Sequence, residues 1–222
     1  MDLGLTPEFL RAGLLLYILL VVTLCLRAYG QAWMANRLGD PTAANDGRLT
    51  LNPVPHIDLI GSVILPLVCI FYLQPMMTSI SFFLAWAKPV PVNPVNFRNP
   101  SRDFMFTQLA NPLMSLVLAL MAAIAGGLLY KVDPRTAEVF GSLIFLNASL
   151  IVIDCLPIPP LPGGMVLRQF GIIGEEMFWQ IARWSGLLLI IAFQIPIVRS
   201  LLSVLIQVIA YPFLIVLQLI AQ

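Results

Sequence analysis

Six long apolar runs constrain the fold of this 222-residue chain more than any other feature of its sequence. A helix needs about 20 apolar residues to cross a bilayer, and these runs approach or exceed that length. They extend from about Leu14 to Trp33, Leu59 to Ile80, Phe104 to Tyr130, Val139 to Leu156, Met177 to Ile197 and Leu201 to Ile220. Only 10% of the residues are charged, against about 25% in soluble domains. The pattern predicts an all-α, polytopic membrane protein that forms one integral membrane domain over residues 1–222.

Charge and cysteine content exclude several other classes of protein. The formal net charge is +1, which argues against nucleic acid as a partner. Cys25, Cys69 and Cys155 lie in apolar runs without close spacing, so we expect neither a disulfide framework nor a cysteine zinc site. No glycine motif for phosphate or dinucleotide binding occurs, and we expect no cofactor. The expected partners are lipid and other membrane proteins, bound through transmembrane helices.

Basic residues in two loops indicate how the second run is placed. The loops 36–58 and 88–103 contain Arg37, Arg48, Lys88, Arg98 and Arg102. The positive-inside tendency favours the cytoplasmic face for both loops. Both can lie there only if Leu59–Ile80 enters and leaves on one side as a re-entrant hairpin, and Pro66 and Pro75 favour such a break. The alternative is that this run spans the membrane.

Prolines determine the form of two further segments. Lys88–Asp103 has prolines at nearly alternate positions, which block a helix and predict an extended segment. We interpret it as a fitted lip over a cavity, with an unstructured linker as the alternative. Pro196 separates the last two apolar runs, which predicts either a helical hairpin over about 177–221 or one long helix broken at Pro196.

Several short motifs resemble those of the short bacterial site-2 proteases, in the same order and spacing over about residues 24–168. The motifs are Ala32-Trp33, residues 38–43, residues 47–53, His56-Ile57-Asp58 with Gly61, residues 86–94, Arg98-Asn99-Pro100, Leu109-Ala110 with Pro112, and residues 156–164. The resemblance implies a site-2 protease-like transmembrane core over about 10–170. It also implies a location in the bacterial cytoplasmic (inner) membrane.

Members of that family are intramembrane zinc metalloproteases with a His-Glu-x-x-His motif and an Asp before a Gly-Gly pair. The two histidines and the aspartate hold zinc, and the glutamate activates the bound water. The resemblance places Arg27, Ala28, Gln31 and Pro162 at these positions. Arg27 repels a cation, Ala28 accepts no proton, and the side chain of Pro162 offers no ligand atom. The single histidine, His56, falls in a loop that supplies no ligand in the family, so we predict no metal, no catalytic residue and no enzyme activity.

Two charges remain within apolar runs, and they suggest what stands in place of the metal. A buried ion is costly unless it is paired, and charges in a membrane usually face the protein interior. We therefore hypothesise that Arg27 and Asp154 form an ion pair between the helices that zinc joins in the family. Alternatively, Arg27 extends to the interface while Asp154 bonds to backbone amides or a hydroxyl.

The predicted function is that of a non-catalytic pseudoprotease, a binding or structural subunit of a membrane protein assembly. The candidate partner-binding residues are Lys88, Pro89, Pro91, Asn93 and His56. One alternative is a pseudoprotease that holds a transmembrane client without cleaving it. Another is an intramembrane metalloprotease with unorthodox ligation through His56, Asp58 and Asp154.

Overall fold

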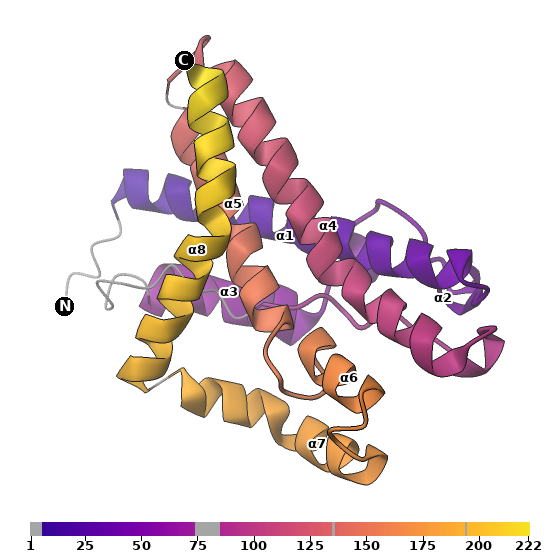
Figure 1. Ribbon diagram of the computed structural model, residues 1–222. Coiled ribbons are helices and arrows are strands. Elements are labelled where there is room, and N and C mark those ends of the chain that lie inside the picture. Colours follow the sequence, from indigo (N-terminus) through magenta and orange to yellow (C-terminus); the bar gives the residue numbers. More distant parts are fainter. Residues whose placement is uncertain (1–5, 74–84, 135, 194) are drawn as a thin grey trace.

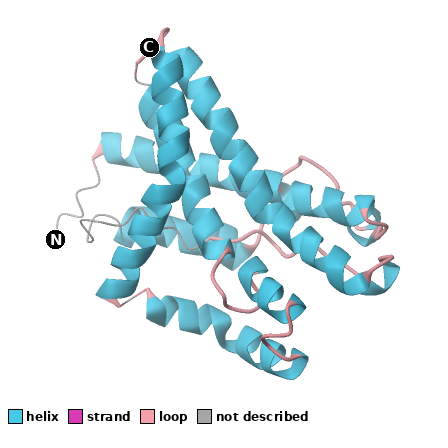
Figure 2. Cartoon of the chain, viewed as in Figure 1, coloured by secondary structure: helices cyan, strands magenta, loops and turns pink. Residues whose placement is uncertain are grey.

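The computed structural model describes residues 6–73, 85–134, 136–193 and 195–222, and within these ranges every regular element is a helix (Figure 2). The long helices are α1 (Pro7–Arg37), α4 (Pro100–Tyr130), α5 (Thr136–Asp154), α7 (Glu175–Ala192) and α8 (Pro196–Ala221). The short ones are α2 (Thr42–Asn45), η1 (Val54–His56), η2 (Leu59–Ile64), α3 (Leu65–Val68), η3 (Cys69–Leu73), η5 (Pro94–Asn96) and α6 (Pro162–Gln169).

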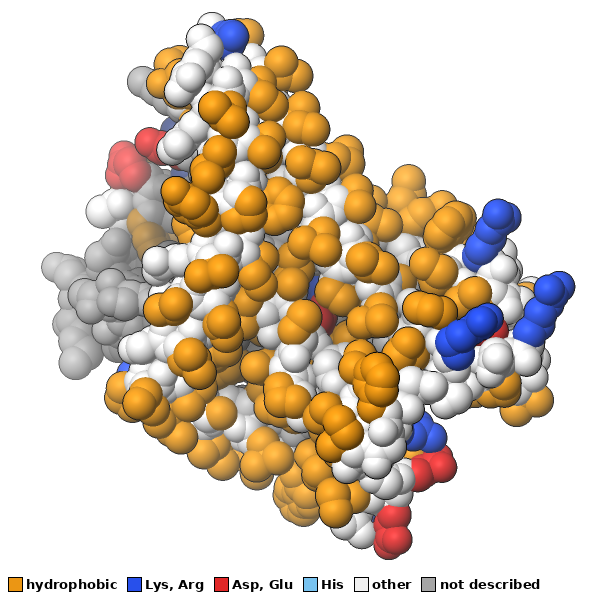
Figure 3. Space-filling model, in the orientation of Figure 1, with side chains coloured by type: hydrophobic (Ala, Val, Ile, Leu, Met, Phe, Trp, Pro, Cys, Tyr) orange, Lys and Arg blue, Asp and Glu red, His pale blue; other side chains and the backbone are white. Residues whose placement is uncertain are grey.

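Four of the described helices, α1, α4, α5 and α8, are long and apolar enough to cross a membrane. No more than 50% of the apolar stretch of each is buried inside the protein, and many of the side chains left exposed are large and hydrophobic. Figure 3 shows such side chains along the faces of these helices. An apolar surface of this extent requires lipid around it. The prediction of an all-α polytopic membrane protein is confirmed.

Helix α4 is the centre of the bundle and packs against α1, α5 and α8 (Figure 1). Small residues permit the close approach. A Cβ atom on Gly126 would lie 2.6 Å from Cβ of Phe140 in α5, and one on Gly127 would lie 2.8 Å from the carbonyl oxygen of Leu217 in α8. Small residues at crossings are typical of membrane helices, where lipid removes most of the hydrophobic driving force for association.

The second apolar run begins with a continuous helical segment, η2–α3–η3, over residues 59–73. The predicted return of the hairpin falls on residues 74–84, outside the described ranges. The chain at residue 86 nevertheless lies beside the start of the run. The Trp86 N–H donates to the Gly61 carbonyl at 3.1 Å, and the Ser62 hydroxyl donates to the Trp86 carbonyl at 2.7 Å. The described chain after the run therefore lies beside the start of the run, an arrangement in keeping with the same-sided placement that the charge pattern predicted.

The C-terminal part of the chain divides at Pro196. Helix α7 ends at Ala192 and α8 begins at Pro196. Helix α8 packs along α4 and α5, whereas α7 packs against α6 and meets α8 at a steep angle (Figure 1). The two segments are thus separate helices, and α8 begins at the proline where the sequence predicted the chain to turn or break.

The glycine contacts at α4 yield a stability prediction. Replacing Gly127 with Ala places a methyl group against the α8 backbone, which should destabilise the protein by about 1–3 kcal/mol. Gly141→Ala in α5 is the matched control, because a Cβ there meets nothing within 4 Å. Thermal unfolding in mild detergent should show a lower midpoint for the Gly127 variant alone. Equal midpoints for both variants would contradict the close packing of α4 on α8.

Candidate functional site

An ion pair between Arg27 and Asp154 lies at the crossing of α1 and α5. Nη2 of Arg27 donates to Oδ2 of Asp154, although the residues are 127 positions apart in the sequence. Arg27 is 6% exposed and Asp154, the last residue of α5, is 8% exposed. The structure thus brings together the two charges found in apolar runs. At this burial their attraction offsets part of the cost of removing both charges from water.

One helical turn after Arg27, Gln31 joins α1 to α4. Its Nε2 donates to Oε1 of Gln108 at 3.0 Å, and its Oε1 accepts from Nδ2 of Asn111 at 3.0 Å. Gln108 and Asn111 are three residues apart and so face the same side of α4. The sequence analysis did not identify this amide cluster, although buried amides in an apolar helix are a signal for such contacts.

Three further buried polar atoms lie on the helices that meet here. Nε of Arg27, Oγ of Ser115 in α4 and Oδ1 of Asn147 in α5 have no hydrogen-bond partner in the described part of the chain. Buried polar groups are normally bonded to protein or to ordered water. The interior between α1, α4 and α5 is therefore polar in character.

The turn after α5 is fixed by close backbone contacts. Pro162 is buried at the first position of α6, where its missing N–H is not needed. A Cβ atom on Gly163 would lie 2.4 Å from the carbonyl oxygen of Leu156, and one on Gly164 would lie 2.6 Å from N of Pro159. Both positions therefore require glycine for steric reasons.

Asp40 is the main anchor of the proline-rich segment, and the sequence analysis did not identify it. Its carboxylate, which is 0% exposed, accepts from the Asn93 N–H at 2.7 Å, from Nδ2 of Asn96 at 2.7 Å and from the N–H and hydroxyl of Thr42. Burial acts to raise the pKa of Asp40, but these hydrogen bonds outweigh it and the pKa is lowered overall. An Asp before Pro-Thr is a common turn signal, but its distant partners cannot be inferred from it.

A second set of contacts holds the beginning of the same segment. Nη2 of Arg48 donates to the Lys88 carbonyl at 2.8 Å, and the Lys88 N–H donates to the His56 carbonyl at 2.8 Å. Nε2 of His56 bonds to the Thr50 carbonyl at 2.9 Å. We call residues 86–96 the lip. Residues 86–93 contain no helix, residues 94–96 form η5, and the loop after α1 bonds to both parts. The segment Lys88–Asp103 is therefore held in place, but it is not extended throughout, because Pro94–Asn96 form η5 and α4 begins at Pro100.

The predicted partner-binding residues do not all lie on the surface of the lip. Lys88, Pro89 and Asn93 are exposed and Pro91 is half-buried. His56 is only 2% exposed, because its ring is packed inward against the loop that contains Thr50. It supports the lip from behind and cannot itself touch a partner in this conformation. Figure 3 shows Lys and Arg side chains gathered at the end of the molecule that contains α2 and the start of α4.

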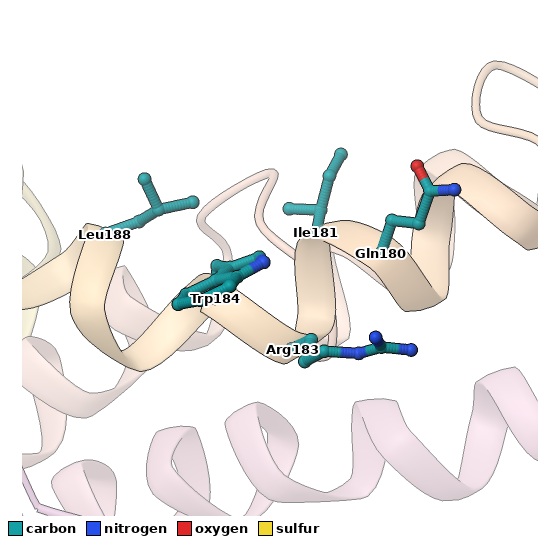
Figure 4. Close-up of a pocket in the computed structure, with 5 residues that line it drawn as sticks. All are labelled: Gln180, Ile181, Arg183, Trp184 and Leu188. Atoms are coloured by element: carbon teal, nitrogen blue, oxygen red, sulfur yellow. The ribbon is translucent and has the colours of Figure 1, made fainter.

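A separate groove of about 490 Å³ runs along α7. It is lined by Gln180, Ile181, Arg183, Trp184 and Leu188, with Ile181 and Leu188 on one side of the helix and Arg183 on the other (Figure 4). None of the residues of the ion pair or of the lip lines this groove.

The residues at the positions that resemble a zinc site do not fit a zinc ion. Arg27 and Gln31 direct donors to Asp154 and Gln108, and neither Ala28 nor Pro162 has a ligand atom. The alternative set is not assembled either. His56 bonds to Thr50, Asp58 caps η2 and Asp154 pairs with Arg27. Within the described ranges, no three His, Cys, Asp or Glu side chains are grouped to hold a metal.

The chain is similar to curated proteins named as zinc metalloproteases. It is 32% identical over 162 residues to "Putative zinc metalloprotease YwhC" of Bacillus subtilis (strain 168), covering 69% of this chain and 68% of that protein. It is 30% identical over 152 residues to "Putative zinc metalloprotease Rip2" of Mycobacterium tuberculosis, covering 67% and 54% respectively. The chain thus spans about half the length of the mycobacterial relative. No family model and no solved structure matches it.

These relatives correct one prediction. The sequence analysis predicted that the chain is not an enzyme, from the replacements at positions 27, 28, 31 and 162. The names of the relatives contradict that prediction, because they point to a protease. Together with the four apolar helices, the relatives support an integral membrane protein. A location in the bacterial inner membrane stays a prediction.

The bonds to Asp40 yield a prediction about the lip. Asp40→Asn turns one of the two carboxylate oxygens into a donor. That donor then faces either the Asn93 N–H, which bonds to Oδ2, or Nδ2 of Asn96, which bonds to Oδ1, and should cost about 1–3 kcal/mol for each unsatisfied group. Hydrogen exchange of the Asn93 amide should become faster. Asp46→Asn, an exposed carboxylate in the same loop, is the control and should leave that exchange unchanged.

His56 yields a pH prediction. Burial lowers the pKa of His56 below its usual value of 6.5, the charge of Arg48 lowers it further, and the bond to Thr50 offsets part of the shift. The unfolded chain therefore binds a proton more readily, so stability is fully present above about pH 6.5 and is lost as the pH falls below it. The thermal unfolding midpoint should decrease as the pH is lowered from 7.5 to 5.5. His56→Gln should make the midpoint depend less on pH. An equally steep dependence in the variant would assign the effect to another group.

Proposed function

This chain belongs to the site-2 protease family, and from that membership we propose that it binds a transmembrane segment of another membrane protein along its lip. In this proposal the chain is a binding or structural subunit of a membrane protein assembly. Its partners are membrane proteins, reached within the bilayer, together with the surrounding lipid.

The observation that carries this proposal is the fixed conformation of the lip. Its inner side is bonded to Asp40, Arg48 and the His56 carbonyl, whereas its outer side chains remain exposed. Val95 is 84% exposed, although it is a large apolar residue. An ordered edge with exposed apolar residues is suited to a partner, because little conformational entropy is lost on binding.

The backbone of the lip supports the same proposal. The N–H groups of Val90 and Val92, two residues apart, have no acceptor in the described part of the chain. Residues two apart in extended chain present their amides along one edge. A locally extended stretch of a partner's transmembrane segment can pair with such an edge by strand addition. Without such pairing, the backbone N–H and C=O groups of the partner's extended stretch would have no hydrogen-bond partner in lipid.

A second candidate function is cleavage of the bound segment, and the names of the relatives favour it. Both candidates require the same first step, which is capture of a partner segment at the lip. They differ in the mass of the captured partner, which remains full-length in the first case and becomes shorter in the second.

Site-specific cross-linking tests the proposal in the native membrane. A photoreactive amino acid at position 95 should capture a defined membrane protein several times more efficiently than one at position 219. Leu219, which is 64% exposed on α8, controls for chance encounters within the bilayer. Mass spectrometry of the adduct identifies the partner and shows whether it has been shortened. Equal capture of many proteins at both positions would contradict the proposal.

A further inference from the structure

We propose that the Arg27–Asp154 ion pair takes the place of a metal ion as the link between α1 and α5, so that this helix crossing holds without zinc. The names of the relatives imply zinc, and the side chains at this crossing do not fit it. The salt bridge between Arg27 and Asp154 joins the same two helices without a metal.

The pair supplies the same mechanical connection as a shared metal. A metal joins two helices because ligands on each bind one cation. Here the cation is the guanidinium of Arg27, which is part of α1, and the anionic acceptor is Asp154 at the end of α5. Pro162, eight residues later, leaves no carboxylate at the position that the resemblance indicates. The carboxylate therefore comes from the last residue of α5 and not from the start of α6.

Gln31 strengthens this arrangement from the next turn of α1. It exchanges hydrogen bonds with Gln108 and Asn111, and so attaches α1 to α4. Arg27 and Gln31 are four residues apart and share one face of the helix. Two positions that the resemblance assigns to metal-binding histidines are thus used to join α1 to α5 and to α4.

Burial makes the two ionic side chains strongly dependent on each other. With one partner removed, the other would remain charged and without a counter-ion between apolar helices. Apolar side chains at both positions would avoid that penalty. The ion pair therefore predicts that each single substitution lowers stability and that the double substitution restores most of it. A metal site or two independent surface charges would not give that result.

The experiment combines metal analysis with a double-mutant cycle on the full-length chain in mild detergent. Wild-type protein, purified from zinc-supplemented cells, should contain far less than one zinc per chain, and its unfolding midpoint should not change with a chelator. Arg27→Met and Asp154→Leu should each lower the midpoint by roughly 5–20 °C. The double variant should recover most of that loss. Arg168→Met, which removes the exposed pair with Glu175, should change it by less than about 3 °C.

Two outcomes would overturn the proposal. The first is stoichiometric zinc in the wild-type protein together with a chelator-sensitive midpoint. The second is additive loss in the double variant, which would mean that the two side chains act independently. If the single variants do not fold, a double variant that folds still shows the coupling, and the metal content of the wild-type protein still tests for zinc. Cross-linking at Val95 is a separate measurement, so failure of the partner proposal is distinguishable from failure of this one.

Discussion

The crossing of α1, α4 and α5 depends on polar contacts formed inside an apolar bundle. Apolar packing alone distinguishes poorly between neighbouring registers in a membrane, because lipid is as apolar as the side chains it replaces. A guanidinium and a carboxylate must meet at one geometry. Arg27 with Asp154, and Gln31 with Gln108 and Asn111, therefore determine how far α1 lies along its two neighbours. The position of α1 in turn sets the place of the loop that holds the lip.

The lip requires a different kind of support, since its non-helical chain has backbone groups that no regular hydrogen-bond ladder satisfies. Prolines reduce the number of N–H groups, and the loop after α1 accepts hydrogen bonds from two that remain, those of Lys88 and Asn93. Asp40, just after the end of α1, bonds to Asn93 and Asn96, which lie more than 50 positions later in the sequence. The order of the lip is thus a consequence of α1 ending where the ion pair and the amide cluster hold it.

Hydropathy and charge predicted the spans and the same-sided second run, because both features depend on transfer from water to lipid and leave a signal in every residue. They were less informative about α7, which begins with Glu175 and Glu176, contains Arg183 and lies at an angle to α8. The contacts of Gln31 and Asp40 were not predictable, because a hydrogen bond depends on the register of segments far apart. His56 illustrates the same limit, since its position in a polar loop gives no sign that it is packed inward.

The ion pair and the lip are held by separate sets of contacts, and this separation has a consequence for the family. The carboxylate of Asp154 bonds to no residue of the lip, and the carboxylate of Asp40 bonds to no residue of α5, within the described ranges. Different side chains at the crossing are therefore compatible with the same lip, provided that α1 stays in register. A pair of opposite charges meets that condition, because it keeps α1 and α5 joined at a single point. The contacts that hold the lip and the side chains at the helix crossing are thus distinct features of one scaffold, connected through the position of α1.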